Sequence, residues 1–295
     1  MQNRSIFRSA LFNKGRADVG GGGWTREIRH IIIVAMSDEA LISAQKNEEV
    51  VVESGPLDPE LKEMLDAGVF YGRTRTKTHP RLKPYITANR SGIEIINLEK
   101  VLPMLRTAEE FLVSRVEKGA LPIVVGTQPM AQEIVSETIS PFGIPFVTNR
   151  WLGGTLTNFK IISKRIEYFT KLKEGLASGA FKGYTKKEQL DLEKESVRMN
   201  VLFGSIEVMS ARPDLLLVID PVVHKTAVQE ARRLGIPVLA FMNTDADPDS
   251  VDYPVLGNTK AKESIQWFLS KMAGAINEGK KKISVVEPAV VTAKE

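Results

Sequence analysis

Side chains suited to ligand binding gather in the segment Asn149–Phe159, between an apolar strand-like run and a long helical pattern. Arg150 beside Trp151 places a planar donor fork next to a flat apolar face, which suits contacts with phosphates and bases. The pair Gly153-Gly154 permits close backbone approach and unusual backbone angles. The same residues also suit a strand-to-helix corner, because such corners often need glycine and a lone tryptophan is usually packed. The segment therefore predicts either a binding site or a structural corner built from Trp151, Gly153 and Gly154.

A second candidate site is the segment Arg73–Lys83, called the basic segment below. It contains several cations, no acid, and threonines at alternate positions that can donate hydroxyl hydrogen bonds. Contacts with a phosphate backbone typically use this mixture of Arg, Lys and hydroxyl groups. A merely solvated face would normally carry both signs of charge. Pro80 and Pro84 favour a loop over a helix here, and Tyr71 and Tyr85 at its edges could stack on bases.

Aspartates gather between Asp245 and Asp252, a pattern that at first suggests a metal site. The turn glycine and the final glutamate of a calcium loop are, however, replaced by Ser250 and Leu256. Aspartates that follow a strand more commonly bond their own backbone and cap turns. A magnesium ion near Asp245, Asp247 and Asp249 remains an alternative. The chain has no Cys and 3 His, which excludes Cys-ligated zinc and thiol catalysis and leaves a multi-His site little to work with.

Three common enzyme motifs are absent from the sequence. It lacks the dinucleotide fingerprint G-x-G-x-x-G, the P-loop motif G-x-x-x-x-G-K-S/T and the G-x-S-x-G nucleophile elbow. We therefore assign no catalytic residue, no cofactor and no metal. Asp220 and Asp247 follow predicted strands, where α/β sheets bind ligands. They leave one alternative open, an α/β enzyme that binds a nucleotide or a sugar phosphate.

Composition sets only broad limits on function. The chain has 295 residues, of which 43% are hydrophobic, so it can bury a sizeable core. Its formal net charge of +4 permits an anionic partner without requiring one. No stretch approaches the roughly 18 apolar residues of a membrane-spanning helix. The lack of Cys fits a reducing, cytoplasmic location, whereas the basic, acid-free residues 1–16 leave an organellar location as the alternative.

Apolar strands alternate with amphipathic helices, which predicts an α/β fold, a Rossmann-like parallel sheet covered by helices on both faces. The predicted strands are Ile93–Leu98, Pro122–Val125, Pro145–Thr148, Leu215–Ile219 and Val238–Met242. The predicted helices are Pro59–Ala67, Glu99–Lys118, Met130–Ile139, Val222–Leu234 and Lys260–Asn277.

Residues 155–211 interrupt this alternation. Apolar residues from Leu156 to Leu176 recur at spacings of three and four, a heptad-type pattern. Thr185 and Glu188 have the spacing of a capping box that opens a second helix. The pattern predicts an inserted antiparallel coiled-coil hairpin that projects and grips a partner. We interpret residues 57–282 as the α/β domain that contains it, residues 1–56 as a flexible N-terminal extension and residues 283–295 as a disordered tail.

Several motifs in order resemble the bacterial form of the ribosomal protein S2 family. They are Met64–Val69, Lys83–Ile86, Asn149–Gly154, Leu156–Phe159, Pro213–Leu215, Ile236–Val238, Asp247-Pro248 and Val251–Pro254. Any one of these motifs alone would be weak, but together they are highly specific. The resemblance covers residues 57–282. The chain departs from the family's pattern in two motifs. Gly72 is followed by Arg73 instead of His, and Asn243-Thr244-Asp245 replaces Asp-Thr-Asn.

The resemblance implies a non-enzymatic role in translation, as a structural constituent of the small ribosomal subunit. It implies binding to small-subunit rRNA and to neighbouring ribosomal proteins including S1, with no membrane and no small-molecule substrate. Our candidates for rRNA contact are Arg73, Arg75, Lys77, His79, Arg81, Lys83 and Arg150. With this role, Trp151, Gly153 and Gly154 are favoured as the structural corner that opens the hairpin. The implied location is the cytoplasmic ribosome.

Overall fold

The structure is a computed structural model that describes residues 58–181, 183–209 and 211–286. The predicted N-terminal extension, residues 1–56, lies outside these ranges. The last helix continues to Val286, and the remainder of the predicted tail is outside the described residues. No helix in the described ranges is long and apolar enough to cross a membrane.

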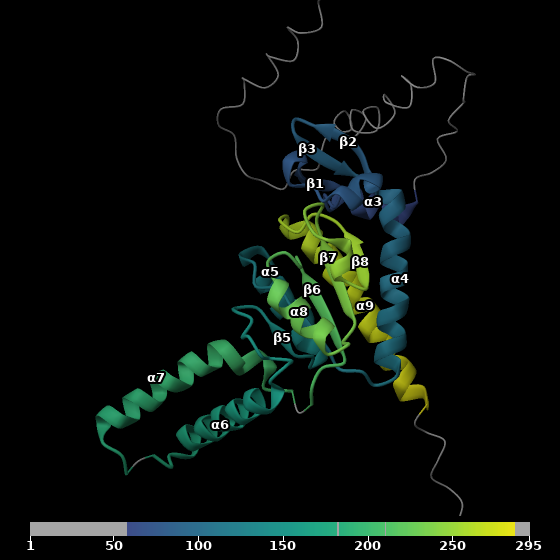
Figure 1. Cartoon of the computed structure of the whole chain (residues 1–295). Helices are drawn as coiled ribbons and strands as arrows, with labels where there is room; N and C mark the ends of the chain where they lie inside the picture. Colours follow the sequence, from purple (N-terminus) through teal and green to yellow (C-terminus); the bar gives the residue numbers. More distant parts are fainter. Residues whose placement is uncertain (1–57, 182, 210, 287–295) are drawn as a thin grey trace, which may run out of the picture. The chain divides into compact units, whose positions relative to one another are not determined.

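A five-stranded parallel sheet forms the centre of the fold, in the order β5-β4-β6-β7-β8 (Figure 1). Its strands are β4 (Pro122–Val125), β5 (Phe146–Val147), β6 (Leu215–Ile219), β7 (Val238–Met242) and β8 (Tyr253–Leu256). Every residue of β4, β6 and β7 is buried. A parallel sheet buried on both faces selects uniformly apolar strands, so the sequence prediction of an α/β fold is confirmed.

Helices cover both faces of this sheet. They are α4 (Leu98–Glu117), α5 (Pro129–Ile139), α8 (Lys225–Arg233) and α9 (Lys262–Val286), and α3 (Pro59–Asp66) packs on α4 and α9. The chain moves from β4 to β5 in one direction and from β6 to β7 in the other. Right-handed crossovers therefore place α5 and α8 on opposite faces. In Figure 1, α8 lies in front of the sheet and α9, which packs on α4 and α5, lies behind it.

A second, three-stranded antiparallel sheet has the order β1-β3-β2. Its strands are β1 (Tyr71–Thr74), β2 (Ile86–Arg90) and β3 (Ile93–Ile96). The prediction that Ile93–Leu98 is a strand of the parallel sheet was wrong, because β3 is the central strand of this small sheet and Leu98 begins α4. Its two partners are polar and half-exposed, so they lack the apolar pattern of a strand.

Short 3-10 helices replace the predicted loop in the basic segment. They are η1 (Arg75–Lys77) and η2 (Pro80–Tyr85). Elsewhere the chain forms the 3-10 helices η3 (Ser140–Phe142), η4 (Gly204–Ile206) and η5 (Pro248–Ser250). The buried side chain of Leu82 anchors η2.

Two helices, α6 (Phe159–Ser178) and α7 (Lys186–Phe203), follow β5 and precede β6 as an antiparallel hairpin (Figure 1). The buried side of α6 consists of Ile162, Ile166, Phe169 and Leu172, as the spacing predicts. The capping box of Thr185 and Glu188 is present. Side chains of α7 are mostly exposed, and Phe203 is the buried one in that helix. Supercoiling of the pair stays a prediction.

The hairpin should open independently of the sheet, because its helices contact mainly each other. Phe169 is 1% exposed, so Phe169→Ala should remove about 3–5 kcal/mol of local stability. We expect faster hydrogen exchange in α6 and α7 with unchanged protection in β6. The matched control is Tyr168→Ala, at a neighbouring side chain that is 47% exposed. Equal acceleration in β6 would show that hairpin and sheet unfold as one unit.

Candidate nucleic-acid interface

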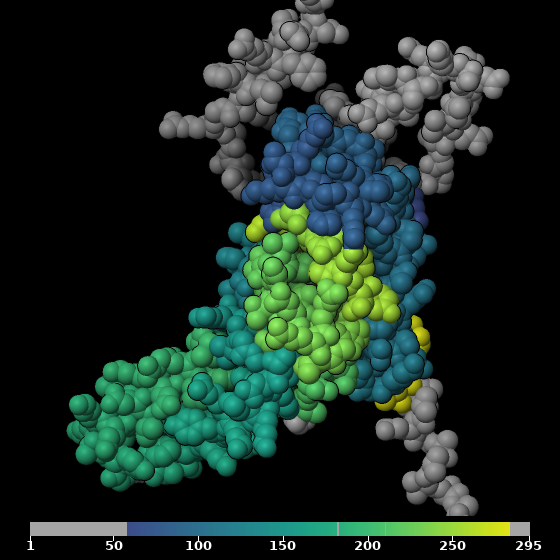
Figure 2. All heavy atoms as spheres, in the orientation of Figure 1, coloured from purple at the N-terminus to yellow at the C-terminus, as the bar shows by residue number. Residues whose placement is uncertain are grey.

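Hydrogen bonds from backbone amides hold the basic segment against Thr244, directly after β7. The amide of Arg73 donates to Thr244 Oγ1 at 2.9 Å, and the amide of His79 donates to Thr244 O at 2.8 Å. A Cβ on Gly72 would lie 2.9 Å from Glu94 O and 3.0 Å from Thr244 Cγ2. Glycine is therefore required for this close approach. In Figure 2 the blue surface of the small sheet meets the yellow-green surface of the chain around residue 250.

Arg73 points into the protein. Its Nε lies 3.0 Å from Asp245 Oδ2 and its Nη2 lies 3.6 Å from Asp220 Oδ2, and its side chain is 23% exposed. A guanidinium held by two carboxylates is poorly available to a phosphate. The structure therefore gives Arg73 an intramolecular role that the segment's own sequence did not indicate. Arg73 and Asp245, which lie in the two motifs where the chain departs from the family pattern, are in direct contact.

Aspartates from the loop after β7 face the rest of the basic segment. Asp247 Oδ1 lies 3.8 Å from His79 Nε2, and Asp249 forms an ion pair with Arg81. The sequence inference that the basic segment lacks compensating acids was thus wrong, because the acids come from a distant part of the chain. Asp247 also caps η5, as predicted for these aspartates. No group of acids and histidines in the described ranges is arranged to hold a metal ion.

Three cations of the basic segment remain available for an external ligand. Arg75, Lys77 and Lys83 are exposed, and their side chains have no ion-pair partner within the part of the chain that the structure describes. The hydroxyls of Thr74 and Thr76 lie exposed beside them. This combination can bind a phosphate backbone without reading base sequence.

The crevice between β4 and β6, where α/β folds commonly bind nucleotides, is filled by the protein's own side chains. Gln128 Nε2 donates to Asp220 Oδ2 at 2.6 Å, and Thr259 Oγ1 donates to the same oxygen at 3.2 Å. Asp220 has a positive φ of 64° and its Oδ1 accepts from the amides of Val222 and Val223. Asp220 is therefore engaged in internal bonds, which gives the enzyme alternative no support.

His224, beside this crevice, is a buried neutral imidazole. Burial lowers its pKa from the ordinary 6.5, against the opposing effect of Asp220. Its Nδ1 lies 3.0 Å from Asp220 O and its Nε2 accepts from the amide of Thr127 at 3.1 Å. These contacts select the tautomer with the proton on Nδ1.

The segment Asn149–Phe159 wraps around one carboxylate, Glu230 of α8. Glu230 accepts from Trp151 Nε1 at 3.2 Å, from the amide of Gly154 at 2.8 Å and from the amides of Leu156 and Thr157 at 3.1 Å. Burial acts to raise the pKa of Glu230, but these hydrogen bonds outweigh it and hold the pKa below its usual value. Gly154 has φ of +91°, a conformation that glycine adopts readily.

Glu230 is a site residue that the sequence reasoning missed. It is 6% exposed and shares the buried face of α8 with Ala227 and Ala231. A lone carboxylate at helical spacing among apolar residues was the available signal. Gly153 has open space around it, and Arg150 is exposed without an ion pair in the described chain. The corner is thus held by Glu230, and Arg150 is free to meet a ligand.

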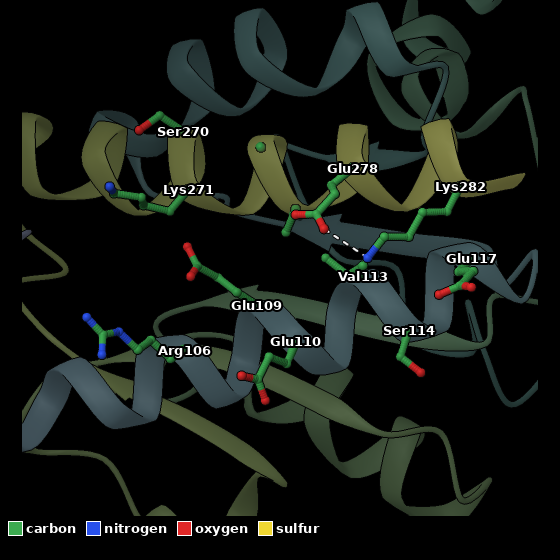
Figure 3. A pocket seen from close by; sticks show the side chains of 12 residues that line it. Arg106, Glu109, Glu110, Val113, Ser114, Glu117, Ser270, Lys271, Glu278 and Lys282 are labelled. Carbon is green, nitrogen blue, oxygen red and sulfur yellow. Dashed lines mark ion pairs between the residues drawn. The ribbon is translucent and has the colours of Figure 1, made fainter. Parts of the chain in front are cut away.

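An open groove of about 540 Å³ lies between α4 and α9 (Figure 3). Its lining contains the carboxylates of Glu109, Glu110, Glu117 and Glu278 beside the cations of Arg106, Lys271 and Lys282. Burial raises the pKa of Glu109. The Lys282 ammonium in the groove pairs with Glu278 at 2.9 Å, and the Lys271 ammonium pairs outward with Glu63 at 2.7 Å. An RNA backbone would meet like charge here, so this groove is a poor site for it.

Replacing the Glu230 carboxylate should destabilise the corner. Glu230→Gln puts an amide nitrogen in a site where the carboxylate accepts from five donors, and it should lower the free energy of unfolding by at least about 2 kcal/mol. Urea unfolding, followed by far-ultraviolet circular dichroism, measures the loss. Glu263→Gln, at an exposed position of α9, is the control. Equal stability of the two variants would show that Glu230 does not hold the corner.

Stability should fall in acid because of His224. Its folded pKa is lowered, so its contribution is complete above the unfolded value of 6.5 and is lost as pH falls below it. We expect a slope of at most about 1.4 kcal/mol per pH unit between pH 6.5 and the folded pKa. Denaturant unfolding at several pH values should show this slope in the wild type and a smaller one in His224→Gln. Identical slopes would contradict a buried neutral His224.

Comparisons with known proteins identify the family of this chain. The family model for ribosomal protein S2 matches residues 64–279. The chain is 40% identical over 227 residues to "Small ribosomal subunit protein uS2" of Dehalococcoides mccartyi, covering 77% of this chain and 93% of the relative. It is 41% identical over 219 residues to the protein of that name from Geotalea uraniireducens, covering 74% of this chain and 86% of the relative. The chain therefore belongs to the ribosomal protein S2 family.

Proposed function

We propose that this chain is a structural component of the small ribosomal subunit that binds small-subunit rRNA. Family membership implies a non-enzymatic role, and the exposed cations of the basic segment supply the chemistry. Arg75, Lys77 and Lys83 contact phosphates, and the neighbouring hydroxyls of Thr74 and Thr76 add donors. Arg81 and His79 join them when RNA displaces their aspartate partners. Arg150 forms a separate contact beside the corner.

The division of labour among the cations follows from their burial. Arg73 braces β1 on the parallel sheet, because its two carboxylate partners are largely buried. Removing it would leave Asp220 buried without its cation, which is costly. Arg73 therefore holds the basic segment in position, whereas Arg75, Lys77 and Lys83 contact the ligand.

Protein partners complete the proposal. Neighbouring small-subunit proteins, including ribosomal protein S1, bind surfaces other than the basic segment. The α6–α7 hairpin is a candidate for such contacts because its outer residues Ile161, Val197 and Val201 are apolar and more than half exposed. The proposed location is the cytoplasmic ribosome, and the first residue of the mature chain tests the organellar alternative.

A charge-removal series tests the RNA contact. Arg75→Ala, Lys77→Ala and Lys83→Ala together should weaken binding to purified bacterial small-subunit rRNA. The slope of log affinity against log salt should become shallower by up to about three units, near one unit per lost phosphate contact. Filter binding over a salt series measures both quantities.

The control replaces Lys118, Arg232 and Arg233 by Ala, three exposed cations on α4 and α8 with the same total charge. We expect this control to keep the wild-type slope. Arg73→Ala should lower the free energy of unfolding but change the slope of log affinity against log salt only slightly. If the control triple and the basic-segment triple lose the same affinity, the basic segment is not the contact.

A further inference from the structure

The loop after β7 holds its aspartates against the basic segment in a fixed register. Asp245, Asp247 and Asp249 alternate along this loop, and each has one partner in the basic segment. The register is set by the backbone, because Thr244 O accepts from the amide of His79. Asp247 Oδ1 also accepts from the amide of Asp249 at 3.1 Å, which fixes the turn that carries both carboxylates.

The three contacts differ in their exposure to solvent. Asp245 is 15% exposed and its pair with Arg73 lies inside the protein. Asp249 and Arg81 are 58% and 60% exposed, and Asp247 is 53% exposed beside His79. Exposed ion pairs are weak and open readily, whereas a partly buried pair persists. A phosphate can therefore displace the two outer aspartates but not the inner one.

We infer that Asp247 and Asp249 are built-in competitors for phosphate at the basic segment and thereby restrict which RNAs it accepts. This inference rests on the proposed rRNA contact. Asp249 occupies the Arg81 cation that an RNA phosphate would use, Asp247 lies against His79, and both carboxylates repel phosphates that come close without displacing them. An RNA whose backbone fits Arg75, Lys77 and Lys83 avoids much of this repulsion, while an RNA of arbitrary shape does not.

The test neutralises both competitors without removing their backbone contacts. In Asp247→Asn with Asp249→Asn, the side-chain oxygen that accepts from residue 249 is kept, so η5 should persist. Exposed pairs of this kind change affinity by a factor of about 1.4 to 5 each. We expect rRNA to bind the double variant about 2 to 30 times more tightly at low salt. The gain should shrink at high salt because the charges are exposed.

Selectivity distinguishes competition from a general charge effect. Polyuridylate of matched length is the unselective probe, and its affinity should rise more than that of purified bacterial small-subunit rRNA. Glu110→Gln with Glu117→Gln is the matched control, since it makes the same charge change in the α4–α9 groove and should alter either affinity less than twofold. Circular dichroism checks that all proteins are folded.

The outcomes separate the inference from the proposed function. If wild type binds rRNA and the aspartate variant behaves like the glutamate control, or binds more weakly, the competitor role is overturned. An equal gain for polyuridylate and rRNA would overturn the selectivity. If neither wild type nor the variant binds rRNA, the proposed function fails together with this inference.

Discussion

The contact of Arg73 with Asp245 and Asp220 connects the two sheets of this protein. Without a cation, Asp220 would be a carboxylate with 1% exposure at the carboxyl end of β6. Such a group is expensive to bury unless it is paired and hydrogen-bonded. Arg73 supplies the charge from β1, and Gln128 and Thr259 supply hydrogen bonds from the parallel sheet's own loops. The position of the small sheet, and with it the display of the basic segment, depends on this arrangement.

Glu230 solves a related problem at the other candidate site. A loop that leaves a strand and begins a helix exposes several amides that no secondary structure satisfies. The Glu230 carboxylate accepts from the amides of Gly154, Leu156 and Thr157 and also from the Trp151 indole. In both places a buried carboxylate collects donors from a distant segment and fixes its geometry. Arg73 and Trp151, whose side chains suggested ligand binding from the sequence, contact these carboxylates of the protein itself.

This use of charge divides the protein's surface. Arg75, Lys77 and Lys83 have no ion-pair partner in the described part of the chain, Arg81 pairs with Asp249, His79 lies beside Asp247, and Arg73 is committed to the fold. The groove between α4 and α9 carries an excess of carboxylates on its lining. The exposed cations of the basic segment and the groove with its excess of carboxylates are therefore separate surfaces of the protein. The filled crevice between β4 and β6 is consistent with a fold that resembles nucleotide-binding sheets but serves as a scaffold.

The sequence by itself determined the elements whose signal is local. Strands β4, β6 and β7 begin and end where their apolar runs do, and the seam of α6 follows its heptad-like spacing. Motif order also identified the family. Only the tertiary structure revealed the small antiparallel sheet, the partner of Arg73 and the role of Glu230. Asp245 lies 172 residues from Arg73 along the chain, and Glu230 lies 76 residues from Gly154. The spacing of apolar residues within one element can be read from neighbouring positions in the sequence. The partner of a charged side chain or of an edge strand is set only when distant segments pack together.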